Sequence, residues 1–82
     1  MSGFGSTIIG NTVIGTAMNG ISAGEGCTIK NNTVYGSGED GITLTGYSLV
    51  DGNTVYNNNL SGGGYANISE CTTCVFGNNV AP

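Results

Sequence analysis

Groups that could perform acid–base catalysis are scarce in this 82-residue chain, which has five acidic residues, one basic residue and no His. The charged side chains are Glu25, Lys30, Glu39, Asp40, Asp51 and Glu70. An enzyme that cleaves polysaccharides typically places two carboxylates across a groove, one as acid and one as base or nucleophile. Glu39 and Asp40 are adjacent in a loop, where they are expected to repel each other rather than share a proton. We therefore predict that the chain is not an enzyme and uses no cofactor.

The other reactive side chains are three cysteines. Cys27 is expected to be a buried thiol, because it takes a small-residue position of the repeat described below. Cys71 and Cys74 form a C-x-x-C pair, but a zinc site would need two more ligands and the chain has no His. We predict no metal site, and either a local Cys71–Cys74 disulfide or two thiols. Cys74 is expected to face outward.

The charge balance excludes one class of partner. The formal net charge is −4, and Lys30 is the one basic residue. Nucleic-acid binding requires clustered Lys and Arg side chains, so no nucleic-acid partner is expected. The chain has no apolar run of about 18 residues, which predicts no membrane-spanning helix. It also lacks a visible signal peptide at its beginning.

A repeat organises the whole chain. Asn-Thr-Val occurs at Asn11, Asn32 and Asn53, with a spacing of 21 residues, and Asn-Asn-Val follows at Asn78 after a further 25. A repeat of this length is typical of a solenoid in which each copy forms one coil. The fourth copy is longer by four residues, and we place most of this insertion in the loop 57–64.

Apolar and polar residues alternate within each copy, which indicates short extended strands. The apolar positions on either side of the repeated Asn are Ile8, Ile29, Val50 and Val75, and Val13, Val34, Val55 and Val80. In the fourth copy, Ala66 and Ile68 are expected to replace Ile42 and Leu44 inside the coil. The pattern predicts an all-β solenoid of about three and a half coils of about 21 residues, with three short parallel strands per coil. It forms a single domain, 1–82, with coils at roughly 6–19, 20–40, 41–64 and 65–82.

The motif G-I-x-L-x-x-x-S-x-V-x-x-N-T-V, from Gly41 to Val55, resembles the repeat of right-handed parallel β-helix proteins. That superfamily includes pectate-lyase-like enzymes, alginate epimerases and phage tailspikes. The resemblance extends from Ser6 to Val80 and implies a right-handed coil. It also implies that the repeated asparagines point inward and stack as a structural ladder. The ladder residues would be Asn11, Asn32, Asn53 and Asn78.

Outward-facing residues of the repeat suggest a second, weaker role. Thr33, Tyr35, Thr54 and Tyr56 are expected to stack on the outer face of one sheet. Stacks of like side chains stabilise neighbouring coils, which is the simpler interpretation. Aromatic rings on a flat sheet could also bind sugar rings, so a polysaccharide is an alternative partner.

Two further surface features follow from the repeat. Lys30 and Asp51 should occupy equivalent outward positions on neighbouring coils and form a surface ion pair. The sequence also contains three N-x-S/T sequons, so glycosylation stays open. They begin at Asn31, Asn59 and Asn67.

The ends of a solenoid expose unpaired strand edges, and this sequence has no candidate cap. We therefore expect a structural subunit that polymerises end to end with itself into an extracellular or cell-surface filament. The interface residues would be Ile8, Val13, Ile68, Val75 and Val80. The alternatives are a fragment of a carbohydrate-associated β-helix protein (a phage tailspike, an adhesin or a polysaccharide lyase) and a sugar-binding module that uses the Thr/Tyr face.

Overall fold

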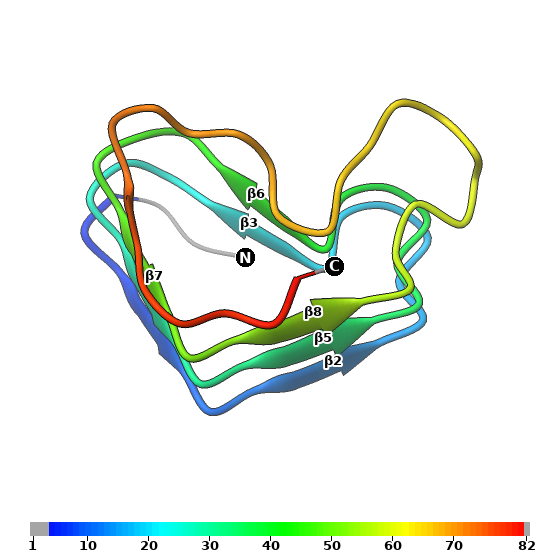
Figure 1. Cartoon of the computed structure of the whole chain (residues 1–82), viewed down its shortest axis with the longest axis horizontal. Coiled ribbons are helices and arrows are strands. Elements are labelled where there is room, and N and C mark those ends of the chain that lie inside the picture. Colours follow the sequence, from blue (N-terminus) through cyan, green and yellow to red (C-terminus); the bar gives the residue numbers. More distant parts are fainter. Residues whose placement is uncertain (1–3, 82) are drawn as a thin grey trace.

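The computed structural model describes residues 4–81, in which every regular element is a short strand. The strands are β1 (Thr7–Ile9), β2 (Thr12–Ile14), β3 (Ile21–Ala23), β4 (Thr28–Lys30), β5 (Thr33–Tyr35), β6 (Ile42–Leu44), β7 (Leu49–Asp51), β8 (Thr54–Tyr56) and β9 (Val75–Phe76). Figure 1 looks along the coil and shows the chain winding repeatedly around one core. The strands are short because Gly or Asn turns follow them closely in the sequence.

Three parallel sheets form the sides of the coil. The first sheet contains β1, β4, β7 and β9, the second contains β2, β5 and β8, and the third contains β3 and β6. Ile68 extends the third sheet through a parallel bridge to Ile42, and Val80 extends the second through a bridge to Thr54. The predicted all-β architecture, with parallel strands stacked coil on coil, is confirmed.

The core consists of stacked aliphatic columns. Ile8, Ile29 and Val50 are register partners in the first sheet, and Ile29 and Val50 are completely buried. The other buried aliphatic pairs are Val34 with Val55, Ile21 with Ile42, and Ala23 with Leu44. Each fully buried Val or Ile side chain contributes about 1.5–3 kcal/mol. The columns therefore supply the main driving force for coiling.

The turn between the first and second sheets requires a left-handed backbone conformation. Gly52 has a φ of 68°, and Asn31 holds the same position one coil earlier with a φ of 56°. Gly adopts this conformation without steric cost and Asn tolerates it better than other residues. A Cβ on Gly52 would also collide with the Asn31 side chain. This corner turns the chain sharply enough for the next residue to point into the coil.

The fourth coil differs from the prediction in its register. β9 pairs Leu49 with Val75 and Val50 with Phe76, so the fourth copy is longer by five residues rather than four. Phe76 therefore takes the inward position, and the prediction that Val75 does so is wrong. Val80 lies opposite Thr54, in an outward column, so its predicted inward position is also wrong.

The whole insertion precedes the bridge to the third sheet. Ile68 pairs with Ile42, so the predicted replacement of Ile42 by Ala66 and of Leu44 by Ile68 is wrong. Ala66 is exposed, at the end of the loop 57–66. Figure 1 shows this loop projecting sideways from the coil, so it does not cover the end of the molecule.

Candidate functional site

A column of asparagine side chains stands at the turn between the first and second sheets. The backbone N–H and Nδ2 of Asn11 donate to Oδ1 of Asn32 at 2.9 and 3.1 Å. Asn32 donates to Asn53 in the same way, at 3.0 Å for both bonds. Asn53 donates to Asn79 at 3.0 and 2.9 Å. Because Asn32 and Asn53 are buried, these bonds satisfy polar groups that water cannot reach.

The fourth residue of this ladder is Asn79, so the prediction of Asn78 is wrong. Asn78 is exposed, and its backbone N–H donates to Asp51 Oδ1 at 2.9 Å. The error follows from the fifth inserted residue, which moves every later position by one. The sequence contained a signal for it, since in the pair Asn31-Asn32 the second Asn is the ladder residue, as in Asn78-Asn79.

The last coil leaves an apolar edge without a neighbour. Within residues 4–81, β9 pairs with β7 on one side and with no strand on the other. Phe76, which stacks on Val50 in the inward column, remains 45 % exposed, and Val75 and Val80 are 64 % and 58 % exposed. A core position that stays open to solvent, next to an unpaired strand, can accept another strand. Sequence reasoning missed Phe76 because it depends on the register of the fourth coil.

A disulfide between Cys71 and Cys74 closes the turn before β9. Both cysteines are half-buried and pack against the core. The register of β9 places Cys74 above Ser48, in the column that contains Cys27 one coil earlier, so the predicted outward orientation of Cys74 is wrong. Cys27 is a buried thiol whose backbone N–H donates to Ser48 Oγ at 3.2 Å. The disulfide therefore covers one part of the core at this end of the coil.

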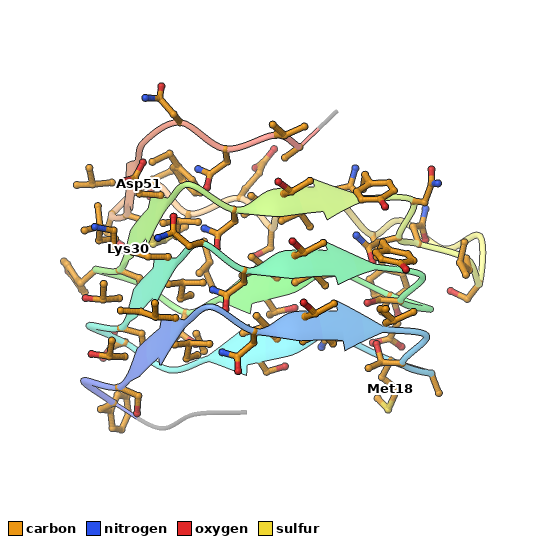
Figure 2. All side chains as sticks on the ribbon, turned by 90° about the horizontal axis from the view of Figure 1, so that it is seen from below. Met18, Lys30 and Asp51 are labelled. Carbon is orange, nitrogen blue, oxygen red and sulfur yellow. A yellow bond between two sulfur atoms is a disulfide. The ribbon has the colours of Figure 1, made fainter. Side chains whose placement is uncertain are left out.

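The opposite end is formed by β1 and β2, which each pair with one strand among the described residues. Ile8 is 5 % exposed and Val13 is half-buried. Met18 is an exposed apolar side chain at this end of the molecule, as Figure 2 shows. The residues predicted to form a subunit interface divide between the two ends. They are Ile8 and Val13 in the first coil, and Ile68, Val75 and Val80 at the other end.

Both ends of the sequence lack charged side chains. All six charged residues lie between Glu25 and Glu70, so residues 1–20 and 71–82 carry none. Edge strands of natural sheets often carry Lys or other charges that oppose pairing with a second chain. This protein has no such protection on β1, β2 or β9.

The Thr/Tyr face lies on the second sheet. Thr33 and Thr54 are register partners, and so are Tyr35 and Tyr56. The two tyrosine rings stack with their centroids 5.1 Å apart and an angle of 21° between their planes. Because each ring covers one face of the other, a sugar could stack only on an outer face of the pair. The contact stabilises neighbouring coils by about 0.5–1.5 kcal/mol.

Glu39 and Asp40 hold the loop 57–66 through hydrogen bonds. The Tyr65 O–H donates to Glu39 Oε2 at 3.2 Å, and the Ala66 N–H donates to Asp40 Oδ1 at 2.7 Å. The hydrogen bond to Glu39, together with the negative charge of Glu39, raises the pKa of the Tyr65 phenol. The arrangement fastens a loop to the coil.

Lys30 and Asp51 are register partners on neighbouring strands of the first sheet, and Figure 2 shows them on adjacent coils. No ion pair joins them in the described part of the chain, so the predicted salt bridge is wrong. Asp51 Oδ1 instead accepts the Asn78 backbone N–H. The carboxylate therefore supports the turn that precedes Asn79.

The three sequon asparagines differ in exposure. Asn31 is exposed, whereas Asn59 and Asn67 are half-buried. Asn67 Oδ1 accepts hydrogen bonds from Nδ2 and the backbone N–H of Asn58 at 3.0 and 3.3 Å. Asn31 is therefore the most accessible of the three side chains.

Residues 4–81 enclose no cavity or cleft, and they contain no group of three or more His, Cys, Asp or Glu that could hold a metal ion. No helix in this stretch is long and apolar enough to cross a bilayer.

In a comparison of the sequence with protein-family models, the model described as the right-handed β-helix region matches residues 1–81. The chain belongs to the right-handed β-helix family. The resemblance of the Gly41–Val55 motif to that family is thereby confirmed, and the coil of this β-helix is right-handed. No curated protein and no solved structure matches the chain.

Proposed function

We propose that this β-helix is a structural subunit that stacks end to end with further copies of itself in an extracellular filament. The observation that carries the proposal is the open last coil, where Phe76 takes a core position but remains 45 % exposed. The first coil of another copy would bury Phe76 and continue the aliphatic columns. The same contact would cover Val80.

Strand addition supplies the second source of affinity. The outer edge of β9 has backbone groups without a partner strand among residues 4–81, and β1 has the same kind of edge at the other end. Parallel pairing of β9 with β1 of another copy would add main-chain hydrogen bonds of the kind used in β-augmentation. The absence of charges from residues 1–20 and 71–82 supports such pairing, because no charged side chain would have to be desolvated.

We propose a structural role rather than a catalytic one. The adjacent carboxylates of Glu39 and Asp40 bind groups of a loop at 3.2 and 2.7 Å, which supports a structural use of these residues. The Cys71–Cys74 disulfide supports an extracellular location, since disulfides persist mainly in oxidising compartments.

The test compares assembly of the wild-type chain with two Lys variants. Phe76→Lys places an ammonium group in the proposed junction, whereas Leu60→Lys makes the same type of change in the side loop, at another exposed apolar residue. We expect wild-type and Leu60→Lys chains to form filaments in negative-stain micrographs and to elute at concentration-dependent sizes. Phe76→Lys should remain monomeric with an unchanged far-UV circular dichroism spectrum.

A wild-type chain that stays monomeric at every concentration would contradict the proposal. It would favour the alternative in which this β-helix is a section of a longer, carbohydrate-associated one. Filaments that persist in Phe76→Lys would also contradict it, because the last coil would then not be the contact.

A further inference from the structure

The asparagine ladder has a direction. In each step the backbone N–H and Nδ2 of one Asn donate to Oδ1 of the Asn in the next coil toward the C-terminus. In these Asn-to-Asn bonds the donor always lies on the N-terminal side and the Oδ1 acceptor on the C-terminal side. The two ends of the ladder are chemically different.

The donor end is Asn79. Asn53 Nδ2 donates to a carbonyl of the preceding coil (Ile29, 2.9 Å), to the carbonyl two residues earlier (Asp51, 3.3 Å) and to Asn79 Oδ1. Asn79 Nδ2 makes the first two kinds of bond, to Val50 O at 2.9 Å and Gly77 O at 3.4 Å. The bond to a further Oδ1 is the one it lacks among the described residues.

The acceptor end is Asn11. Its Nδ2 and backbone N–H donate to Asn32, but no residue among 4–81 donates to Asn11 Oδ1. In Asn32, Asn53 and Asn79 the corresponding Oδ1 accepts two bonds from the coil below. Asn11 Oδ1 thus has the capacity to accept the ladder bond from Asn79, whose backbone N–H donates to Gly77 O at 3.2 Å within the chain.

We infer that the C-terminal end of one copy binds the N-terminal end of a second copy, in the register that places Asn79 of the first directly below Asn11 of the second. This inference rests on the end-to-end stacking proposed above. This register continues the ladder across the junction. It also sets Phe76 below Ile8 in the inward column and Val75 below Thr7 in the outward column, because β1 and β9 both belong to the first sheet. The same alignment therefore continues both the inward column of Ile8 and Phe76 and the asparagine ladder across the junction.

The ladder excludes the symmetric alternatives. Two C-terminal ends brought together would face donors with donors, and two N-terminal ends would face acceptors with acceptors. A head-to-tail contact is heterologous, so it grows an open filament in which all subunits point the same way. The third sheet has β3, β6 and Ile68 but no fourth strand, so the direct strand pairing at the junction comes from the first and second sheets.

Cysteine cross-linking tests this register. Thr7 and Val75 are both exposed and outward-facing, and within one subunit they are separated by three coil spacings, about 14 Å, which is too far for a disulfide. Across the proposed junction they would be direct strand neighbours, about 4.8 Å apart. The native cysteines do not interfere, since Cys27 is buried and the other two are paired.

The experiment mixes Thr7→Cys with Val75→Cys under oxidised glutathione and measures the mixed dimer on a non-reducing gel. We expect the mixed dimer to exceed either homodimer by about tenfold or more. The matched control is Thr28→Cys with Val75→Cys, which uses the same outward column in an inner coil and should give little dimer. Val75→Cys homodimers in excess would overturn the inference in favour of a symmetric contact.

The outcomes separate the two proposals. Filaments without the mixed dimer would leave end-to-end stacking in place and overturn the register. Loss of both filaments and mixed dimer would overturn the stacking itself. A second measurement addresses the amide directly: Asn11→Ala should raise the critical concentration for assembly about tenfold, whereas Thr12→Ala, at the adjacent exposed position, should change it less than about twofold. Equal effects of the two variants would overturn the role of the amide.

Discussion

Replacing Asn53 by Ala tests the asparagine ladder in its most buried part. Asn53 Oδ1 accepts both the backbone N–H and Nδ2 of Asn32 at 3.0 Å, and Asn53 is almost completely buried. Alanine would leave the Asn32 backbone N–H without a partner and Asn32 Nδ2 with only the Ile8 carbonyl, at a cost of about 1–3 kcal/mol for each lost bond. We therefore expect the free energy of unfolding to fall by about 2–6 kcal/mol, which is a large part of the stability of a small domain.

The matched control is Asn11→Ala at the exposed end of the same ladder. Asn11 Nδ2 donates to Asn32 Oδ1, but that oxygen would keep the Asn11 backbone N–H as a donor. The expected loss is about 1 kcal/mol or less, because water can replace the missing partner. Urea unfolding followed by circular dichroism, at concentrations where the chain is monomeric, measures both values. Losses of equal size in the two variants would refute the reasoning, since they would show that burial does not govern the ladder's contribution.

Three further predictions concern other parts of the molecule. Val50→Ala removes a completely buried side chain and should destabilise the chain by about 2–3 kcal/mol in the same urea assay, whereas Leu49→Ala on the outer face should cost under about 1 kcal/mol. Replacing Cys71 and Cys74 by Ser should lower the free energy of unfolding by about 2 kcal/mol or less, because the loop that the disulfide closes is short. Hydrogen exchange should speed up most at the β9 amides, and unchanged exchange there would contradict the disulfide's role in the last coil. The raised pKa of the Tyr65 phenol predicts that, in an ultraviolet difference titration, this ring ionises at higher pH than a tyrosine without a carboxylate neighbour. Glu39→Gln should move the transition back down, and an unmoved transition would show that Glu39 is not the cause.

The coil could be predicted from the sequence because its period leaves a strong pattern. Residues 21 positions apart, such as Ile8 and Ile29 or Val34 and Val55, repeat in type and occupy the same columns. Stacked side chains of one shape pack well, so the repeat carries the fold directly. The stacking of Asn11, Asn32 and Asn53 was implied by the resemblance of the repeat to β-helix proteins.

The register of the last coil could not be predicted in the same way. The Gly-rich sequence before it does not show how many residues belong to the loop and where the repeat resumes. The insertion had four or five residues depending on whether Val80 or Asn79 was matched to its earlier copies. Strand pairing of Val75 with Leu49 decides for five and moves Phe76, Cys74 and Asn79 into the inward columns. A one-residue change of register turns every side chain to the other face, which is why the wrong residues were predicted there.

The proposed assembly also could not be read from the repeat alone. It depends on which Asn-to-Asn bonds Asn11 and Asn79 lack among residues 4–81, and hydrogen-bond direction is a property of the folded ladder. The distribution of charge was visible in the sequence, since residues 1–20 and 71–82 carry none. Uncharged ends indicate that strand edges are unprotected, but they do not indicate which end binds which.

Electron cryomicroscopy of filaments grown from the purified wild-type chain tests the central claim most directly. Four ladder residues per subunit, at about 4.8 Å per coil, predict an axial rise of about 19 Å with all strands parallel across the junction. The map should place Asn79 of one subunit next to Asn11 of the following one. A rise of about 38 Å with subunits in alternating orientation, or a chain that remains a monomer, would contradict the account.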